Sequence, residues 1–419
     1  MSSAPLHEQV LSLSHQAFET LLATTENLLI IQDLDGVCMG LVQDPLTRIM
    51  RPEYVEATRA FDRHFYVLTN GEHIGQRGIN HIVETAFEGN DVPCYLPGLA
   101  AGGVQWQGRE GEVSHPGVSE TELSFLSAVP ARIAERLRVF FKRYPGVLSD
   151  SAFEDCIQAS VLANIASPTA NLNTFYTQLR HRPELYVALQ QDIEALMKQL
   201  LDEAAQAGLE NSFFVHYAPN LGRDGQGQEI VWLSDLEQSG TTDFQFMVQG
   251  AIKEAGVLAI LNQYFWHHTG EYPLGASFNA RQAPREHGAL LELVNTHFDP
   301  EQMPLIVGVG DTVNSQVLEE KGQVMVRRGG SDRNFLTLIQ EIGRQFKTGN
   351  LTVYIDSSAG EVKNRKALQI NAGEVIEGPC DPKDTEDPLQ LNLAFPDGYR
   401  QYCEVFQAAA AQRSARKSD

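Results

Sequence analysis

Short apolar segments alternate with amphipathic ones over the N-terminal quarter of the chain. Residues 28–31 (LLII) and 64–69 (HFYVLT) are apolar runs of strand length, whereas residues 6–26, 52–63 and 75–87 carry apolar side chains near helical spacing. Strands that alternate with helices are typical of a parallel sheet with crossover helices. The pattern therefore predicts an α/β fold.

The middle of the chain has a different pattern. From about residue 106 to 270 it is mostly helical, and residues 130–144 and 190–208 are the clearest predicted helices. A predicted strand at 211–218 and a glycine-rich turn at 220–229 follow. This block is interpreted as an insertion that forms a lobe of its own.

The alternation of strands and helices returns near the C-terminus. It comprises a predicted helix at 287–298 and predicted strands at 303–311 and 350–358. A chain of 419 residues is long enough for two lobes. We expect a core of residues 1–105 and 273–419, interrupted by a cap domain of residues 106–272.

Acidic residues outnumber basic ones, and the formal net charge is −22. This charge argues against binding to nucleic acid or to an anionic membrane surface. It favours solubility, or adaptation to a salty cytoplasm in which an acidic surface stays hydrated. An anionic substrate would then need local positive charge or a cation at its site.

The five cysteines are widely spaced and include no CxxC pair, which is typical of reduced thiols in a cytosolic protein. The N-terminal segment lacks a basic start followed by an apolar core, so we expect no signal peptide. Apolar runs stay shorter than the roughly 18 residues that a membrane span needs. A cytoplasmic location is predicted.

Polar side chains end three of the predicted buried strands. Asp33 and Asp35 follow the first strand, Thr69 ends the second, and Asp311 ends a later one. A single aspartate at a strand end is usually a turn or capping residue. In open α/β sheets, however, ligands bind outside the carboxyl ends of the strands, so the four residues together predict one site.

Clustered carboxylates of this kind require a cation, and oxygen ligands suit Mg²⁺, which also favours phosphate. A carboxylate can attack phosphorus to form an aspartyl-phosphate, and a second carboxylate can transfer the proton. A small hydroxyl such as that of Thr69 can hold phosphate oxygens together with backbone N–H groups. The residues therefore favour phosphoryl chemistry.

Three segments resemble the motifs of the haloacid dehalogenase superfamily of phosphatases. DxDG at residues 33–36 resembles the first motif, YVLTNGE with Thr69 the second, and GVGDTVNS with Asp311 and Asn314 the fourth. The resemblance covers roughly residues 25–105 and 275–360. It implies a Rossmann-like parallel-sheet phosphatase core with a large α+β cap inserted between the second and third motifs.

The resemblance also implies roles for individual residues. Asp33 would be the nucleophile and Asp35 the general acid and base. Thr69, Asn70 and Gly71 would bind the phosphoryl group of the substrate.

A Mg²⁺ ion is the implied cofactor. Asp33, the backbone carbonyl of Asp35, and Asp311 would hold it, and Asn314 falls where the family often places an amide. Ser315 stands where a second acid is usual, so the outer part of the metal site would be built differently.

The third motif of the family supplies a Lys or Arg, which in relatives with a large insertion opens a helix as KGxAL, some 20–30 residues before the fourth motif. The corresponding segment here is PREHGALLELV, with Arg285 and His287 as the available basic residues. Either could supply the charge, or both could merely flank the start of a helix.

The position of the insertion indicates which members of the superfamily this chain resembles. Only 36 positions separate Asp33 from Thr69, so the cap must follow the second motif, as in the trehalose- and sucrose-phosphate phosphatases. The segments DLDGVCMGLV, VLTNGEH and VGVGDTVNSQ resemble the glucosylglycerol-phosphate phosphatases of cyanobacteria. That resemblance implies hydrolysis of 2-O-(glucosyl)-glycerol 3-phosphate in compatible-solute synthesis, with the sugar phosphate and the synthase that makes it as candidate partners.

Other functions remain open from the residues alone. A trehalose- or sucrose-phosphate phosphatase, a non-catalytic relative that binds a phosphosugar or a partner protein, and a phosphotransferase or mutase are the alternatives. The last class usually carries its cap between the first two motifs, which this chain does not. Gly308 and Gly310 could begin a dinucleotide fingerprint, but Val313 replaces its third glycine.

Overall fold

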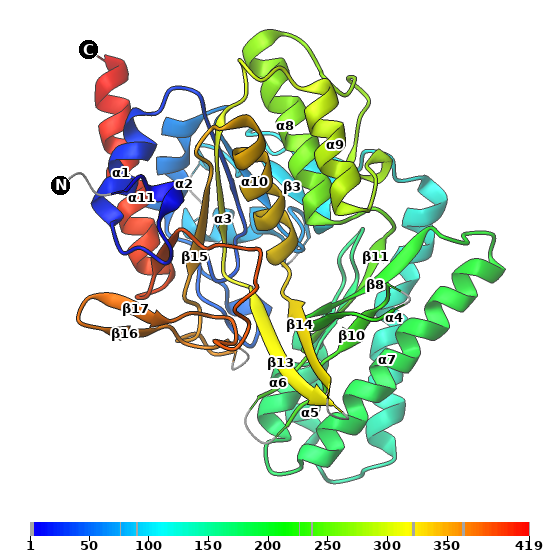
Figure 1. Ribbon diagram of the computed structural model, residues 1–419. Helices are drawn as coiled ribbons and strands as arrows, with labels where there is room; N and C mark the ends of the chain where they lie inside the picture. Colours follow the sequence, from blue (N-terminus) through cyan, green and yellow to red (C-terminus); the bar gives the residue numbers. More distant parts are fainter. Residues whose placement is uncertain are drawn as a thin grey trace.

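An eight-stranded sheet forms the centre of the larger lobe, which we call the core (Figure 1). The computed structural model describes residues 4–75, 77–88, 91–225, 227–235, 238–320, 323–362 and 365–418. Across the sheet the strands are β18 (Leu393–Phe395), β15 (Leu351–Ile355), β12 (Leu305–Gly310), β1 (Leu28–Gln32), β2 (Phe65–Leu68), β3 (Gly98–Ala100), β4 (Gln105–Gln107) and β5 (Val113–Ser114). Neighbours from β18 to β3 pair in parallel, and β4 and β5 add an antiparallel edge.

Helices cover both faces of this sheet. One face carries α1 (His15–Thr24), α2 (Pro52–Ala57), α3 (Ile79–Ala86) and α11 (Tyr399–Ser418), and the other carries α8 (Lys253–Thr269), α9 (His287–His297) and α10 (Arg333–Phe346). In β1, Leu28 and Ile30 face the first group, whereas Leu29 and Ile31 face the second. A strand covered on both faces must be apolar throughout, which explains the LLII run.

The smaller lobe, the cap, is built on a four-stranded antiparallel sheet. Its strands, in spatial order, are β6 (Val161–Leu162), β7 (Thr169–Asn171), β11 (Asp243–Val248) and β8 (Phe213–Ala218). Its helices are α4 (Glu120–Lys142), α5 (Asp150–Ser160), α6 (Asn173–Gln178) and α7 (Pro183–Gln206). The helices and one face of the sheet enclose a second hydrophobic core.

Three hairpins and five short 3₁₀ helices complete the described structure. The hairpins are β9 (Asn220–Arg223) with β10 (Glu229–Val231), β13 (Asn314–Glu320) with β14 (Gln323–Gly329), and β16 (Gln369–Asn371) with β17 (Glu374–Glu377). The 3₁₀ helices are η1 (Leu6–Glu8), η2 (Pro45–Thr47), η3 (Thr58–Phe61), η4 (Ala101–Gly103) and η5 (Ala280–Gln282). The β13–β14 hairpin leaves the core directly after β12 and lies between the two lobes (Figure 1).

The parallel sheet with helices on both faces confirms the predicted fold class. The predicted strands at 28–31, 64–69 and 303–311 correspond to β1, β2 and β12. The predicted N-terminal helix is shorter than its apolar pattern, because Leu11 and Ser12 donate backbone N–H groups to the segment that precedes β18. The glycine-rich turn expected at 220–229 is the β9–β10 hairpin.

The cap is smaller than the predicted domain of residues 106–272. β4 and β5 continue the core sheet beyond residue 105, and α8 packs against the core strands rather than inside the cap. The cap's hydrophobic cluster extends through Ala251, just before α8 begins. An apolar helix such as α8 carries no local signal of which lobe will bury it, so its pattern alone could not set the boundary.

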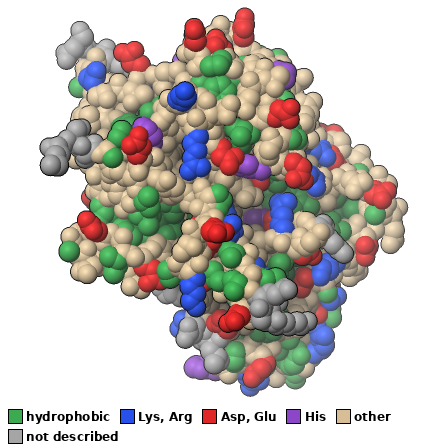
Figure 2. Space-filling view, in the orientation of Figure 1, with side chains coloured by type: hydrophobic (Ala, Val, Ile, Leu, Met, Phe, Trp, Pro, Cys, Tyr) green, Lys and Arg blue, Asp and Glu red, His purple; other side chains and the backbone are tan. Residues whose placement is uncertain are grey.

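Acidic and basic side chains are interspersed over the face shown in Figure 2, without a large region of one sign. All five cysteines are free thiols. Within the described part of the chain, we find no helix with the length and apolar character needed to cross a bilayer.

Candidate active site

Three polar side chains lie at the carboxyl ends of three adjacent core strands. Asp33 follows β1, Thr69 follows β2 and Asp311 follows β12. Because β1 pairs in parallel with both neighbours, these ends meet at one edge of the sheet. All three residues are buried. The sheet topology therefore assembles the group from distant parts of the sequence.

Lys253, the first residue of α8, also lies at this edge of the sheet. Its Nζ lies 2.6 Å from Asp33 Oδ2 and 2.7 Å from Asp332 Oδ1, and the residue is 3% exposed. Burial lowers the pKa of this lysine, but the two carboxylates raise it, and the net shift is upward. The ammonium therefore stays charged between two acids.

The two residues predicted to supply this charge lie elsewhere, and Lys253 takes their place. His287 begins α9, and its Nε2 lies 2.6 Å from Glu341 Oε2. Arg285 lines a separate cavity between the cap and the start of α9. The prediction was wrong about position because it looked 20–30 residues before Asp311, whereas Lys253 precedes that residue by 58 positions.

A sequence signal for Lys253 does exist in the segment IKEAGVL. The lysine opens a helix as in KGxAL, but the glycine, Gly256, follows three positions later rather than directly after the lysine. A Cβ added at Gly256 would lie 2.5 Å from Leu68 Cδ1, so the glycine lets α8 pack closely on β2. This close packing brings the start of α8 to the edge of the sheet that holds Asp33.

Asp332 is an additional buried acid that the sequence pattern did not reveal. Its Oδ2 accepts hydrogen bonds from the backbone N–H groups of Asp311 (2.9 Å) and Thr312 (3.0 Å). Asp332 follows the β13–β14 hairpin. The two ends of this hairpin lie together, because the N–H of Asp332 donates to the carbonyl of Thr312 at 3.1 Å. The acid that is missing at Ser315 is thus supplied from beyond an inserted hairpin.

Asp311 is held by several donors. The hydroxyls of Thr312 and Ser357 each donate to one of its carboxylate oxygens at 2.6 Å, and Arg365 Nε lies 3.4 Å from Oδ2. A Cβ added at Gly36 would lie 2.3 Å from Asp311 Oδ2, and the φ of Gly36 is +80°. The glycine of DxDG therefore serves both the turn and the close approach of Asp311.

The carboxylates of Asp33, Asp311 and Asp332 offer oxygen atoms that all lie within 4.8 Å of one another. Burial raises the pKa of Asp33 to about 7; the charge of Lys253 opposes this shift, and Asp332 and Asp311 add to it. Burial also raises the pKa of Asp311. Lys253 and Arg365 together do not balance the three acids, and a set of oxygen donors in this arrangement fits a hard divalent cation.

Asp35 and Thr69 face the same space. Asp35 Oδ2 lies 3.1 Å from a terminal nitrogen of Arg48, which orients the carboxylate. The hydroxyl of Thr69 accepts a hydrogen bond from the N–H of Gly71 at 3.2 Å. Asn70 and Gly71 line the cavity beside Thr69.

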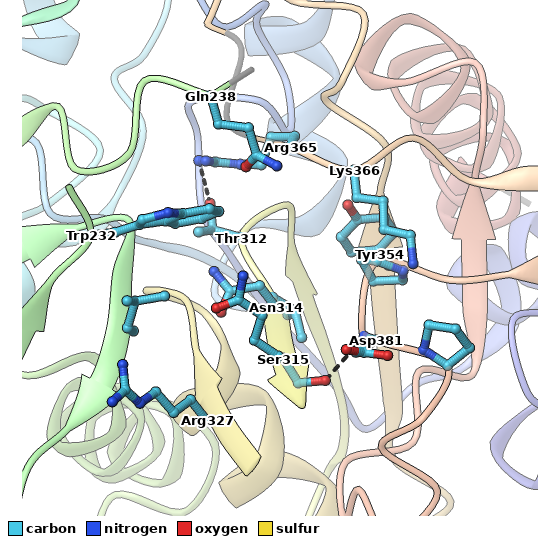
Figure 3. A pocket seen from close by; sticks show the side chains of 15 residues that line it. Trp232, Gln238, Thr312, Asn314, Ser315, Arg327, Tyr354, Arg365, Lys366 and Asp381 are labelled. Carbon is cyan, nitrogen blue, oxygen red and sulfur yellow. Dashed lines mark hydrogen bonds between the residues drawn. The ribbon is translucent and has the colours of Figure 1, made fainter. Parts of the chain in front are cut away.

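Asn314 is not brought to the acids as the sequence predicted. It begins β13 and lines a different cavity of about 400 Å³, together with Trp232 of the cap and Lys366 of the core (Figure 3). Arg365 and Thr312 form the partition between this cavity and the acids, and they are joined by a 2.8 Å hydrogen bond. The hairpin carries Asn314 away, and Asp332 lies beside Asp311 in its place.

The acids open into a cleft of about 160 Å³ between the core and the cap, which we call the interlobe cleft. Its floor contains Asp33, Asp35, Thr69 and Asp311. Its roof is the face of the cap sheet that points away from the cap's hydrophobic core, and polar residues line it: Thr169, Asn171, Asn173, Asp243 and Gln245. A small polar molecule held here would contact both lobes.

The parallel sheet, the DxDG turn and the lysine-bridged carboxylates are typical of phosphatases of the haloacid dehalogenase class. The sequence profile of the glucosylglycerol-phosphate phosphatases matches residues 27–410. A glucosylglycerol-phosphate phosphatase from Synechocystis sp. is 58% identical over 416 residues, which are 97% of this chain and 98% of the relative. The chain therefore belongs to the glucosylglycerol-phosphate phosphatase family.

Solved structures with lower similarity also align over most of the chain. The C-terminal domain of trehalose-6-phosphate phosphatase from C. albicans has 12% identity and a TM-score of 0.48, over 96% of this chain and 99% of that one. Trehalose-6-phosphate phosphatase from Aspergillus fumigatus has 9% identity and a TM-score of 0.39, over 96% and 99% of the two chains.

Proposed function

We propose that this protein hydrolyses 2-O-(glucosyl)-glycerol 3-phosphate to glucosylglycerol and inorganic phosphate. The observation that carries the chemistry is the pairing of buried Asp33 with Lys253 at the floor of the interlobe cleft. The identity of 58% to a relative of that name supports the substrate. The ion pair between Lys253 and Asp33 also argues against a non-catalytic relative, because it supplies the basic residue that the third motif of the family calls for.

Asp33 is the proposed nucleophile. One of its carboxylate oxygens forms a bond to phosphorus while the bond between phosphorus and the glycerol C3 oxygen breaks, which yields an aspartyl-phosphate and releases glucosylglycerol. Lys253 holds the carboxylate in place through its 2.6 Å contact and offsets negative charge as the phosphoryl group arrives. The hydroxyl of Thr69 and the turn formed by Asn70 and Gly71 bind phosphoryl oxygens.

Asp35 is the proposed acid and base. It gives a proton to the departing glycerol oxygen, and then takes one from the water that attacks the aspartyl-phosphate. That attack releases inorganic phosphate and restores the Asp33 carboxylate. Arg48 positions Asp35 for both transfers through the 3.1 Å ion pair.

Mg²⁺ is the proposed cofactor, because the buried donor set consists of oxygens and exceeds the local positive charge. Asp33, the backbone carbonyl of Asp35, and Asp311 would hold it, and Asp332 would support Asp311 through the backbone. When bound, the cation would neutralise charge on the phosphoryl group.

A reducing cytoplasm, in keeping with the free thiols, is the proposed location, and the synthase that makes the substrate is a proposed partner.

Phosphate release from a panel of substrates tests this function. Glucosylglycerol phosphate should be hydrolysed with a higher kcat/KM than trehalose 6-phosphate or sucrose 6-phosphate, and EDTA should abolish the activity until Mg²⁺ is added back. Asp33→Asn should reduce kcat at least about 1,000-fold, since it removes the nucleophile. Full activity in Asp33→Asn would refute the mechanism, and equal rates on the three sugar phosphates would refute only the substrate.

A further inference from the structure

The strands that form the roof of the interlobe cleft alternate between polar and apolar residues over Asp243–Phe246 in β11 and Thr169–Asn171 in β7. In β11, Phe244 and Phe246 point into the cap's hydrophobic core, and in β7, Ala170 does the same. The residues between them point the other way and line the cleft: Thr169, Asn171, Asp243 and Gln245. One face of the cap sheet is therefore polar because it is turned toward the core lobe.

Strand register places these four side chains in a compact block. Asp243 is opposite Asn171, and Gln245 is opposite Thr169. Residues opposite each other in an antiparallel pair have Cβ atoms about 4.5–5.5 Å apart, and residues two apart along a strand share a face. The block thus presents several hydrogen-bonding groups over an area comparable to one sugar ring.

Asp243 keeps acceptor capacity toward the cleft. One of its oxygens accepts from Asn171 Nδ2 at 2.8 Å and the other from the Thr242 hydroxyl at 2.9 Å. A carboxylate has about four acceptor sites, so about two remain. Asp243 lines the same cleft as Asp35 and Arg365 of the core. Burial raises the pKa of Asp243, and the hydrogen bonds from Thr242 and Asn171 oppose this shift.

Gln245 provides a second open acceptor. Its Oε1 is buried and has no hydrogen-bond partner among the described residues. A buried amide oxygen without a partner costs about 1–3 kcal/mol, so such a group is expected to have a ligand when the protein works. Gln245 lies two residues beyond Asp243 on the same strand face and lines the same cleft.

The open groups define the chemistry of the ligand. Acceptors on Asp243 and Gln245 select hydroxyl donors, and the negative charge of Asp243 disfavours a second anionic group at this position. An uncharged polyhydroxyl group, such as a sugar ring, satisfies both conditions. Its phosphate would lie across the cleft at Asp33 and Thr69.

We propose that Asp243, Asn171 and Gln245 form the subsite that binds the sugar hydroxyls and so determine which phosphate ester is hydrolysed. Asp243 and Gln245 accept hydrogen bonds from the sugar, and Asn171 fixes the orientation of Asp243. This inference rests on the proposed function and extends it from the phosphoryl group to the sugar.

The test compares Gln245→Leu and Asp243→Asn with the wild-type holoenzyme on glucosylglycerol phosphate and on p-nitrophenyl phosphate, which has no sugar. Each variant should lose at least about tenfold in kcat/KM for the sugar phosphate, as expected when a site loses a hydrogen bond to substrate. The loss on p-nitrophenyl phosphate should be at least fivefold smaller, a ratio that a general folding defect would not produce. The matched control is Gln249→Leu, because Gln249 Oε1 is also buried without a described partner but lines a different cavity.

The outcomes separate the two proposals. Equal losses on both substrates in Gln245→Leu and Asp243→Asn, or no loss on either, would overturn the subsite while leaving the phosphatase function intact. Wild-type enzyme that hydrolyses p-nitrophenyl phosphate but none of the sugar phosphates would overturn both. A loss in Gln249→Leu as large and as selective as that in Gln245→Leu would also overturn the subsite.

Discussion

At the scale of single residues, the site is organised by Lys253. It contacts Asp33 and Asp332 at once, and its ammonium also lies 5.5 Å from the centre of the Phe335 ring. A buried carboxylate that loses its partner is costly, because the charge cannot be solvated. The lysine therefore serves both the stability of the folded protein and the position of Asp33, the proposed nucleophile.

Replacing Lys253 by Met should reduce kcat at least about 100-fold and destabilise the fold by about 3–5 kcal/mol, because two buried acids then face each other without a partner. Steady-state kinetics and urea unfolding measure the two effects. The control is Lys198→Met, which removes an exposed ion pair with Glu194 on α7 and should change neither quantity appreciably. Activity in Lys253→Met within tenfold of wild type would contradict this role.

At the scale of elements, the segment that follows Thr69 is tied to the cap. Glu72 is 2% exposed and accepts hydrogen bonds from the backbone N–H groups of Ile165 (2.8 Å), Ala166 (2.6 Å) and Ser167 (2.8 Å). Three successive N–H groups around one carboxylate form an anion-binding concavity. The segment proposed to bind phosphate is therefore joined by these hydrogen bonds to the segment that leads into β7 of the cap.

Replacing Glu72 by Gln should loosen this junction, because an amide has one acceptor oxygen where the carboxylate has two. We expect the free energy of unfolding to fall by about 2 kcal/mol, which is typical when a hydrogen bond to a buried charged group is removed. Proteolysis of the segment around Ala166 and hydrogen exchange of the three amides should both accelerate.

The control for this prediction is Glu84→Gln, which alters an exposed carboxylate that accepts a hydrogen bond from Tyr95. It should leave proteolysis of the cap segment unchanged. Protection of the three amides in Glu72→Gln that equals the wild-type value would show that the carboxylate does not hold the junction.

At the scale of the whole molecule, the chain crosses between core and cap near residues 117 and 250, and Arg281 joins both crossings to the core. Its guanidinium donates to the carbonyls of Gly117 and Gln249 and forms a two-point ion pair with Glu122 at the start of α4. Burial raises the pKa of Glu122, but hydrogen bonds from Arg281 and Ser119 lower it to about 2. This cluster therefore links both crossings and the start of α4 to the core.

The lowered pKa predicts how Glu122→Gln changes stability with pH. A carboxyl whose folded pKa lies below its ordinary value of 4.5 stabilises the fold fully above pH 4.5, and this contribution is lost as the pH falls toward 2. Urea unfolding should show Glu122→Gln less stable than wild type at pH 7, with a smaller difference at pH 3. Glu154→Gln removes an exposed pair with Arg138 and should show little difference at either pH. A difference for Glu122→Gln that is as large at pH 3 as at pH 7 would contradict the assignment.

The sequence by itself determined the parallel core and three residues of the candidate site. Apolar runs that end in Asp33, Thr69 and Asp311 suffice for this, because the carboxyl ends of parallel strands necessarily meet at one edge of a sheet. Strand periodicity is local, so it can be recognised without knowing what the strand packs against.

Only the tertiary structure decided the rest. Lys253 lies 220 positions from Asp33, and Asp332 reaches Asp311 only because an inserted hairpin closes on itself. The polar face of β7 and β11 likewise lines the interlobe cleft only because the cap packs above the core. Which helix start, loop or strand face meets the strand ends depends on packing between distant segments, and no local pattern of residues records that packing.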